Sequence, residues 1–286
     1  MYTLTITNKD NRKLTFNELD ANYIITNIQG LSPSNATINT VQAALIDGGI
    51  YNSAKLNMRT LNIAFAIEEP VEVNRLEAYQ VLRVKEPVTI TYTSPKIDVY
   101  IEGYVENVNI GHFDKKQKAT VSLLCPQPYW LSAQEIINEL STTNAIFHFP
   151  FHNLVDHTDI VFGLLSDDAK AVVPNGGGIE TGVIFEILAY DTVSGIKIFD
   201  YITREFIGLD FEMQAGDLIT INTMQGKKSI ILTRNAIETN IFNSLMKDST
   251  WLQLAAGGSV YVFTLESGSN SSVEISIKHN NLFEGV

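Results

Sequence analysis

Three histidines, His148, His152 and His157, lie within ten residues of one another and are the first candidates for chemistry. Three imidazoles provide enough protein ligands for a catalytic zinc ion. Pro150 stands between the first two, so His148 and His152 cannot share the face of a continuous helix. On a strand these two would face the same side, whereas His157 would lie beyond the turn that follows. No carboxylate–histidine pattern completes the set, and we interpret the three as structural histidines, with no metal site.

The other patterns associated with catalysis or nucleotide binding are incomplete. No serine has a Gly-x-Ser-x-Gly setting, and no Gly-x-x-x-x-Gly-Lys-Ser/Thr run occurs. The run 175–178, Asn-Gly-Gly-Gly, lacks the lysine of a phosphate loop and precedes a β-type stretch instead of a helix. Glu68-Glu69 and Asp167-Asp168 are adjacent pairs, whereas a glycosidase needs two carboxylates that face each other. The sequence therefore predicts no enzyme and no cofactor, and a surface loop at 175–178.

Cys125 is the only cysteine, so an intrachain disulfide and a thiolate metal cage are both excluded. It ends an apolar run that begins at Val121, and we interpret it as a small core residue. Among the aromatic residues, Trp251 is the best candidate for stacking on a sugar ring. Its apolar neighbours Leu252 and Leu254 make burial an equally good interpretation, so both remain open.

Composition limits the classes of partner. The formal net charge is −12, from 32 acidic and 20 basic residues. Such a chain lacks the positive field that gives affinity for nucleic-acid backbones, so specific DNA or RNA binding is not expected. No basic leader precedes an apolar stretch at the N-terminus, and no window reaches the roughly 18 apolar residues that span a bilayer. We expect synthesis in the cytoplasm and no membrane insertion.

The elements that must position these residues are mostly β. Hydrophobic residues are 45% of the 286, which is enough for one large β domain or two modest domains. Alternation predicts strands in the first half at 2–7, 13–16, 56–67, 88–92, 99–105 and 118–124. Within 56–67 the period of two breaks between Met58 and Leu61, which predicts a bulge or bend.

One helix is predicted in the first half, between Pro70 and Pro87. Asn74 is the predicted N-cap, with Glu77 three residues later. The predicted apolar stripe, which we expect to pack on a sheet, contains Leu76, Tyr79 and Leu82 or Val81.

A domain boundary is predicted after the segment 125–130, where two prolines end the preceding strand. Ser132 and Glu135 then form a capping box, and Leu131 can pack on Ile136, which predicts a connector helix at about 133–140. In the second half, strands are predicted at 145–149, 182–190, 195–199, 218–222, 229–232, 260–265 and 272–278, with a short helical piece at 240–246. The spacing of their turns is typical of a sandwich. The expected organisation is a β domain at 1–130, a connector helix within 131–144 and a β-sandwich at 145–286.

Taken together, these segments resemble the distal tail (Dit) family of siphovirus tail components. In the first half the resemblance rests on the strand 100–106 (Tyr-Ile-Glu-Gly-Tyr-Val-Glu) and on the segment 123–130. In the second half it rests on 182–187, on 215–223 with 226–228, on 251–258 and on the end at 281–286. The usual Pro-Gly-x-Asn near the end of the family is here Ala-Gly-Gly-Ser at 256–259. The resemblance covers nearly the whole chain in the right order.

The resemblance implies a hexameric ring around a channel, closed by the N-terminal domains, with a galectin-like C-terminal β-sandwich projecting outward. One face of the ring would dock the tail tube protein and the other the tail-associated hub protein, and receptor-binding proteins would attach at the periphery. DNA would pass through the channel, where acidic groups would repel it. The implied location is the tip of a virion tail, and neighbouring subunits would cover exposed sheet edges.

Two other classes of function are alternatives to this one. A carbohydrate-binding module would act through the C-terminal sandwich, with Trp251 as the contact, although a fold by itself does not carry function. A hydrolase would need a constellation of catalytic residues that the sequence does not provide. The sequence favours a structural subunit of a phage tail tip.

Overall fold

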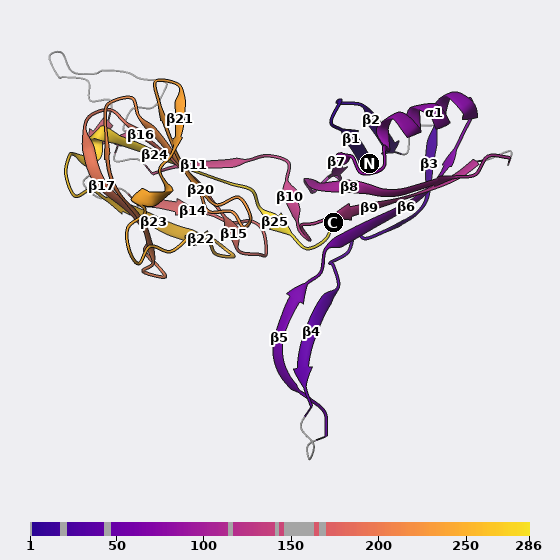
Figure 1. The fold of residues 1–286 in the computed structure, drawn as a ribbon, viewed down its shortest axis with the longest axis horizontal. Coiled ribbons are helices and arrows are strands. Elements are labelled where there is room, and N and C mark those ends of the chain that lie inside the picture. Colours follow the sequence, from indigo (N-terminus) through magenta and orange to yellow (C-terminus); the bar gives the residue numbers. More distant parts are fainter. Residues whose placement is uncertain are drawn as a thin grey trace, which may run out of the picture. The chain divides into compact units, whose positions relative to one another are not determined.

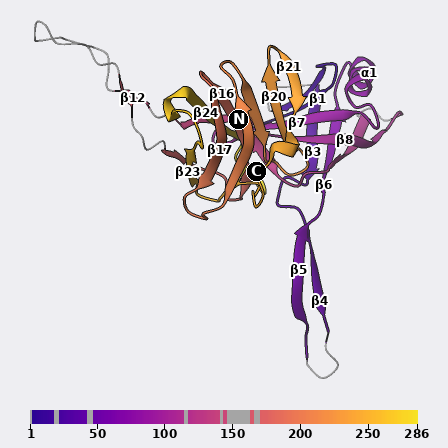
Figure 2. The same cartoon turned by 60° about the vertical axis from the view of Figure 1, so that its left-hand side comes forward.

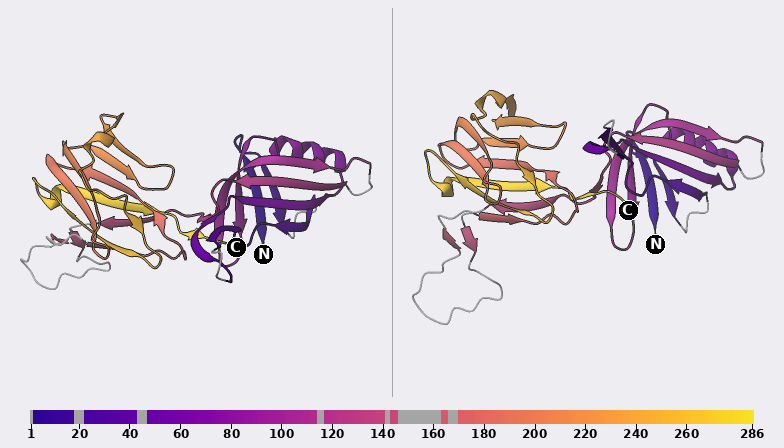
Figure 3. Two further views of the ribbon diagram at one scale, coloured as in Figure 1. Left: turned by 60° about the horizontal axis from the view of Figure 1, so that its bottom comes forward. Right: turned by 90° about the horizontal axis from the view of Figure 1, so that it is seen from below.

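The computed structural model describes residues 2–17, 22–42, 47–113, 117–140, 143–145, 163–165 and 170–286. The described chain is mostly β, as predicted, with one α-helix. It divides into two compact units (Figure 1): the first contains Met1–Gln134 and Leu282–Val286, and the second Glu135–Asn281. Both chain ends therefore belong to the first unit (Figure 3). No described helix is long and apolar enough to cross a membrane.

The first unit is built on one nine-stranded antiparallel sheet. Its strands are β1 (Thr3–Asn8), β2 (Lys13–Asn17), β3 (Tyr23–Gln29), β6 (Arg59–Ile67), β7 (Pro87–Thr93), β8 (Asp98–Ile110), β9 (Gln117–Cys125), β10 (Trp130–Ser132) and β25 (Leu282–Phe283). The order is β2-β1-β7-β8-β9-β6-β3, and β10 pairs with both β8 and β25. The predicted alternation is present, because every second residue of β1, β6 and β9 is buried.

The two ends of this strand order come together around an aromatic cluster. Phe16 on β2 and Tyr23 on β3 have ring centroids 6.1 Å apart, and Phe65 lies 5.0 Å from Phe16. All three side chains are buried in one core with the inward residues of the other strands. The sheet therefore curls around its own apolar face, which a flat sheet of this size would leave half exposed.

The helix α1 (Val71–Val81) begins and packs differently from the prediction. Its N-cap is Pro70, and Asn74 is a buried residue of the helix whose side-chain amide donates to the carbonyl of Glu68 (2.9 Å). The Tyr23 hydroxyl donates to the Asn74 carbonyl (2.8 Å), so this face must turn inward. Val81 and the C-cap residue Leu82 are buried as expected, but the other two residues of the predicted stripe, Leu76 and Tyr79, are exposed. That part of the prediction was wrong, because a polar hydrogen bond set the rotation of the helix.

The second unit is a sandwich of two antiparallel sheets. The six-stranded sheet contains β11 (Ile136–Leu140), β24 (Val273–His279), β16 (Ile184–Ala189), β19 (Leu218–Asn222), β20 (Ser229–Arg234) and β21 (Ile237–Asn240), in that order. The four-stranded sheet contains β14 (Lys170–Val173), β23 (Ser259–Thr264), β17 (Val193–Asp200) and β18 (Phe206–Met213). Two short pairs, β15 (Thr181–Gly182) with β22 (Gln253–Leu254) and β12 (Thr143–Ala145) with β13 (Gly163–Leu165), complete the strands.

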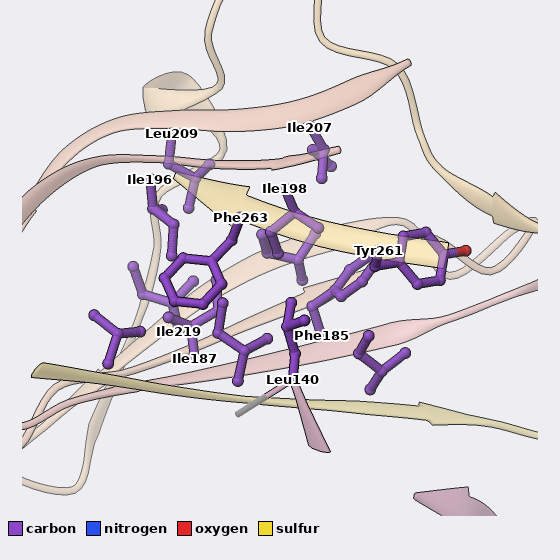
Figure 4. Close-up of a cluster of buried hydrophobic side chains, with 14 of the residues drawn as sticks. Leu140, Phe185, Ile187, Ile196, Ile198, Ile207, Leu209, Ile219, Tyr261 and Phe263 are labelled. Carbon is purple, nitrogen blue, oxygen red and sulfur yellow. The ribbon is translucent and has the colours of Figure 1, made fainter. Parts of the chain in front are cut away.

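The core of the sandwich is formed by inward side chains of both sheets (Figure 4). Phe185 from the six-stranded sheet meets Tyr261 from the four-stranded sheet edge to face, with centroids 5.4 Å apart. Both are fully buried, and the Tyr261 hydroxyl donates to the carbonyl of Gln253 (3.1 Å). A 3-10 turn at Phe242–Ser244 occupies part of the predicted helical piece, and a second lies at Asn270–Ser272.

The connector helix predicted at about 133–140, within 131–144, is absent from the described residues 131–140, and this prediction was wrong. Its place is taken by β10 and β11, separated by a short turn in which the Ser132 hydroxyl donates to the Gln134 carbonyl. β11 pairs with β24 over five residue pairs, from Ile136 opposite His279 to Leu140 opposite Ile275. Backbone pairing with a strand more than a hundred residues away outweighs a local capping signal, because each pair adds ladder hydrogen bonds and buries apolar surface.

Two titratable side chains of the second unit have pKa values shifted in the same direction. Hydrogen bonds from Arg234 lower the pKa of the buried Asp217 carboxyl, although its burial opposes the shift. Burial lowers the pKa of His279, which has no exposed surface, against a smaller opposing effect of the Asn280 backbone. The folded unit therefore holds Asp217 ionised and His279 neutral.

We expect the free energy of unfolding of the second unit to fall in two steps as the pH is lowered. From about pH 6.5, unfolded His279 takes up a proton that the folded state excludes, and below about pH 4 unfolded Asp217 does the same. Urea unfolding at pH 7, 5.5, 4 and 2.5 measures both steps. His279→Leu should remove the first step and keep the second; an unchanged first step in that variant would contradict the assignment.

Candidate assembly interface

A two-stranded arm of the first unit stands apart from its sheet (Figures 1 and 2). It consists of β4 (Ala36–Val41) and β5 (Ile50–Leu56), which pair only with each other. Every residue of the two strands is exposed except Leu56, which is half-buried. No described side chain from elsewhere covers either face of the arm along most of its length.

The arm exposes apolar side chains on both faces, Ile38 and Tyr51 on one and Val41 and Ile50 on the other. The register places Ile38 opposite Ala54 and Ala36 opposite Leu56, and a bulge near Asn39 brings Tyr51 onto the same side. On the other face Thr37 donates to Asn57 (2.8 Å) and Asn39 to Ser53 (3.0 Å). Ile38 and Tyr51 are 62% and 65% exposed. The arm therefore presents an apolar strip to solvent.

This exposure makes the arm a candidate assembly element. An isolated hairpin is marginally stable in water, because two strands bury too little apolar surface against each other. A contiguous apolar patch on an otherwise polar protein is typical of a contact surface. The alternation of residues did not reveal the arm and predicted a single strand over 56–67 with a bulge. The structure has a junction at Asn57 and Met58, where the arm ends and β6 begins, so the predicted bulge or bend is a break between two strands.

Asp47-Gly48-Gly49 is the sequence signal that would have found the arm. Gly48 has a φ of 91°, and Gly next to Asp between two β-prone runs is a hairpin signature. The runs on either side are short and rich in Asn, Ser and Thr, so their alternation is weak.

The root of the arm is held by one buried guanidinium. Arg59, the first residue of β6, is 2% exposed, and its guanidinium carbon lies 5.6 Å from the centroid of the Trp130 ring. It donates hydrogen bonds to four backbone carbonyls, those of Pro128 (2.9 Å), Ser32 (2.7 Å), Gly30 and Glu284. Burial lowers the pKa of Arg59, and the nearby Cys125 opposes this shift. The guanidinium thus joins the start of the arm, the loop before β10 and the C-terminal tail.

Two further contacts fix the same root. Gly30 has a φ of 96°, and a Cβ at this position would lie 2.2 Å from the carbonyl oxygen of Thr60, so no other residue fits. The backbone amide of Val286 donates to the carbonyl of Leu31 (3.1 Å). The position where the arm leaves the sheet is therefore determined by contacts far apart in the sequence.

The residues that the sequence singled out for chemistry do not come together. Trp251 is half-buried against the sandwich core, with the Phe242 ring 5.7 Å away and the Lys228 ammonium 5.2 Å from its centroid. Cys125 is fully buried in the other unit, and burial raises the pKa of its thiol to about 12. The three histidines lie outside the described residues. Within the described ranges no group of His, Cys, Asp and Glu is arranged to hold a metal ion.

The loop at 175–178 is held by its asparagine. The buried Asn175 amide donates to the carbonyls of Ile179 (2.8 Å) and Ala255 (3.1 Å), and its side-chain oxygen accepts from the backbone amide of Gly177 (2.9 Å). The backbone amide of Gly176 donates to the side chain of Asn281 (3.1 Å). These amides are used internally, in keeping with a structural loop.

Two family models match the chain, one on each unit. Residues 9–125 match the phage tail protein RIFT-related domain, and residues 176–283 match the siphovirus-type tail component, C-terminal domain. The two matches follow each other in order and together span most of the sequence. The chain belongs to the siphovirus distal tail family. It is therefore related to structural components of phage tails and baseplates.

Solved structures share the fold along the whole chain of this distal tail family member. The crystal structure of SPP1 Dit (gp 19.1), described as a paradigm of the hub adsorption apparatus in phages that infect Gram-positive bacteria, has a TM-score of 0.66 at 16% identity. It covers 97% of this chain and 98% of that one. A chain of the phage P2 baseplate in its activated conformation with Ca has a TM-score of 0.53 at 15% identity and covers 98% of both chains. No curated protein matches the chain in sequence.

Proposed function

We propose that this distal tail family member is a structural subunit of a hexameric hub ring at the tip of a phage tail. In this ring the first unit forms the wall, and one face joins the tail tube protein while the other joins the tail-associated hub protein. The observation that carries the proposal is the arm, a hairpin whose exposed apolar side chains no described part of its own chain covers. A neighbouring subunit supplies that partner, because association buries the strip that a monomer exposes.

The outer surface of the nine-stranded sheet has the composition expected of a channel wall along which DNA moves without binding. On the outer face of β3, β6, β8 and β9 a groove of about 260 Å³ is lined mainly by neutral polar side chains, among them Asn27, Gln29, Asn62, Asn107, Thr120 and Ser122. No lysine or arginine lines this groove. Phosphate-backbone affinity requires such cations, so a wall of amides and hydroxyls on a chain of net charge −12 does not hold DNA.

The second unit takes the peripheral role in this proposal. As a galectin-like β-sandwich it would face outward and carry receptor-binding proteins, without catalysis and without a cofactor. The Phe242 ring and the Lys228 ammonium that lie beside Trp251 belong to the same unit as Trp251. Nothing in the arrangement of these three side chains favours a sugar as the bound partner. The virion tail tip is the location that goes with this role, after synthesis in the host cytoplasm.

The mass of the protein in solution tests whether the chain forms a ring. Variants of the arm test whether the arm is responsible for the association. We expect the wild-type chain to form a six-fold ring at high concentration, seen by light scattering and negative-stain imaging. Changing Ile38 and Tyr51 together to Asp should weaken association by about 100-fold or more, because two apolar side chains worth ~1.5–3 kcal/mol each become charged. Both side chains are exposed, so folding should be preserved.

The matched control replaces two exposed apolar residues of the second unit by Asp. Val172 and Tyr190 are exposed apolar residues of the second unit, and their change to Asp should leave the ring intact. A chain that stays at 31.8 kDa at every concentration would count against self-assembly. A ring that survives the arm variant would refute the role of the arm.

A further inference from the structure

The C-terminal tail, residues 282–286, completes the first unit although it follows the whole second unit in sequence. Its strand β25 pairs with β10 and places Phe283 opposite Trp130. Phe283 and Val286 both pack against the core of the first unit, in which Trp130 is fully buried. A unit whose other residues end at Gln134 therefore depends on the tail for one strand and for part of its apolar contacts.

The tail also lies directly against the root of the arm. Residues 30–35 join β3 to the first strand of the arm, and the backbone amide of Val286 donates to the Leu31 carbonyl within this segment (3.1 Å). A Cβ at Gly285 would lie 3.2 Å from the same carbonyl oxygen and 3.0 Å from the Cδ of Pro33. The tail backbone therefore approaches this segment too closely to leave room for a larger side chain.

The end of the second arm strand is joined to the tail through Arg59. This residue follows β5 after only two residues, and its guanidinium donates to the carbonyls of Glu284 in the tail and Ser32 before the arm. The backbone amide of Asn57 donates to the carbonyl of Asn35 (2.9 Å), which closes the base of the hairpin. Both strands of the arm therefore start from a base that the tail contacts, one side directly and the other through the guanidinium.

We infer that the C-terminal tail is a strap that fixes the arm for assembly. The inference rests on the proposed ring and concerns what prepares the arm for it. Because no described side chain covers the arm along most of its length, only its root can fix its direction. An arm that is ordered in the free subunit loses less conformational entropy when it associates than an arm that is loose. Since the tail follows residues 135–281, the arm is fixed only after the second unit has been made.

Gly285→Val in the full chain tests the strap. The added methyl groups need more space than the Cβ position leaves beside Leu31 and Pro33, so the tail should leave the root. We expect faster hydrogen exchange at the Asn57 amide, with unchanged exchange in β9 and in the second unit. The concentration at which half of the chains are assembled, measured by light scattering, should rise by about tenfold or more, because the loose arm is ordered only on association.

Two further variants separate the strap from a general loss of folding. Val286→Pro removes only the amide donor to the Leu31 carbonyl and should produce both changes at smaller size, even if Gly285→Val unfolds the first unit. Glu284→Ala is the matched control in the tail. The Glu284 residue is exposed and contacts Arg59 through its backbone carbonyl, so both measurements should match the wild-type chain.

The outcomes distinguish the strap from the ring. Normal assembly of Val286→Pro and Gly285→Val, together with faster exchange at Asn57, would overturn the inference and leave the proposed ring standing. Unchanged exchange at Asn57 in both variants would overturn it as well, since the root would then be fixed without the tail. Failure of the wild-type chain to associate would instead overturn the proposed function, on which the inference rests.

Discussion

Replacing Arg59 by Met is expected to destabilise the first unit by ~3–5 kcal/mol, because the change leaves four backbone carbonyls without the buried donor that joins them. The methionine fills part of the volume but donates no hydrogen bond. The carbonyls of Pro128, Ser32, Gly30 and Glu284 belong to three separate segments, so the arm root and the C-terminal tail should loosen together. Urea unfolding gives the size of the effect, and hydrogen exchange resolved by peptide gives its location.

A surface arginine of the same unit provides the matched control for this variant. Arg83 pairs with Asp10 at 3.5 Å, and both side chains are nearly half exposed. Its replacement by Met should cost less than ~1 kcal/mol, since exposed ion pairs contribute little. Arg59→Lys should remain strongly destabilised, because one ammonium cannot reach carbonyls on three segments. Near-native stability of either Arg59 variant would show that water replaces the guanidinium and that the root is not held as described.

Phe185→Ala is expected to destabilise the second unit by ~3–5 kcal/mol, the usual cost of deleting a buried aromatic ring. Phe185 lies between the two sheets with no exposed surface, and its loss also removes the edge-to-face contact with Tyr261. Because each sheet is supported by its own backbone ladder, the sandwich cannot collapse far enough to fill the cavity. Urea unfolding at pH 7 measures the loss.

The part of the chain that Phe185→Ala destabilises tests whether the two units unfold separately. Hydrogen exchange should increase in the second unit of the Phe185 variant and in the first unit of the Arg59 variant. The tail 282–286 should follow the first unit, since Arg59 and Leu31 hold it. Equal increases across both units in either variant would show that the chain unfolds as one body and that the units are not separate domains.

The alternation of apolar residues was sufficient to predict most of the strands that form the two cores. Strand β19 has the predicted bounds 218–222, and β1, β7, β9 and β24 agree with the predictions to within two residues. This succeeds because a strand that is buried on one side must repeat with a period of two, whatever its partners are. The order of the resembling segments along the chain also indicated the family, and the two family models confirm it.

The sequence was less informative where a long-range contact decided the local structure. The capping box at Ser132 predicted a helix, but pairing with β24 makes Ile136–Leu140 a strand. Leu76 and Tyr79 were predicted to face the sheet, but the hydrogen bond from Tyr23 to Asn74 turns them to solvent. In each case a contact across tens of residues or more outweighs a local preference of about 1 kcal/mol.

The candidate interface shows the same division between local and long-range information. From the sequence alone follow the β-rich class, the acidic charge, the lack of a catalytic constellation and the membership of a tail family. Only the tertiary structure shows that β4 and β5 leave the sheet, that Arg59 fixes their root to the C-terminal tail, and that α1 presents its apolar side outward. The physical reason is that the solvent exposure of a side chain is decided by the fold. An apolar residue type is compatible both with a buried core position and with an exposed contact surface, so the sequence does not distinguish the two.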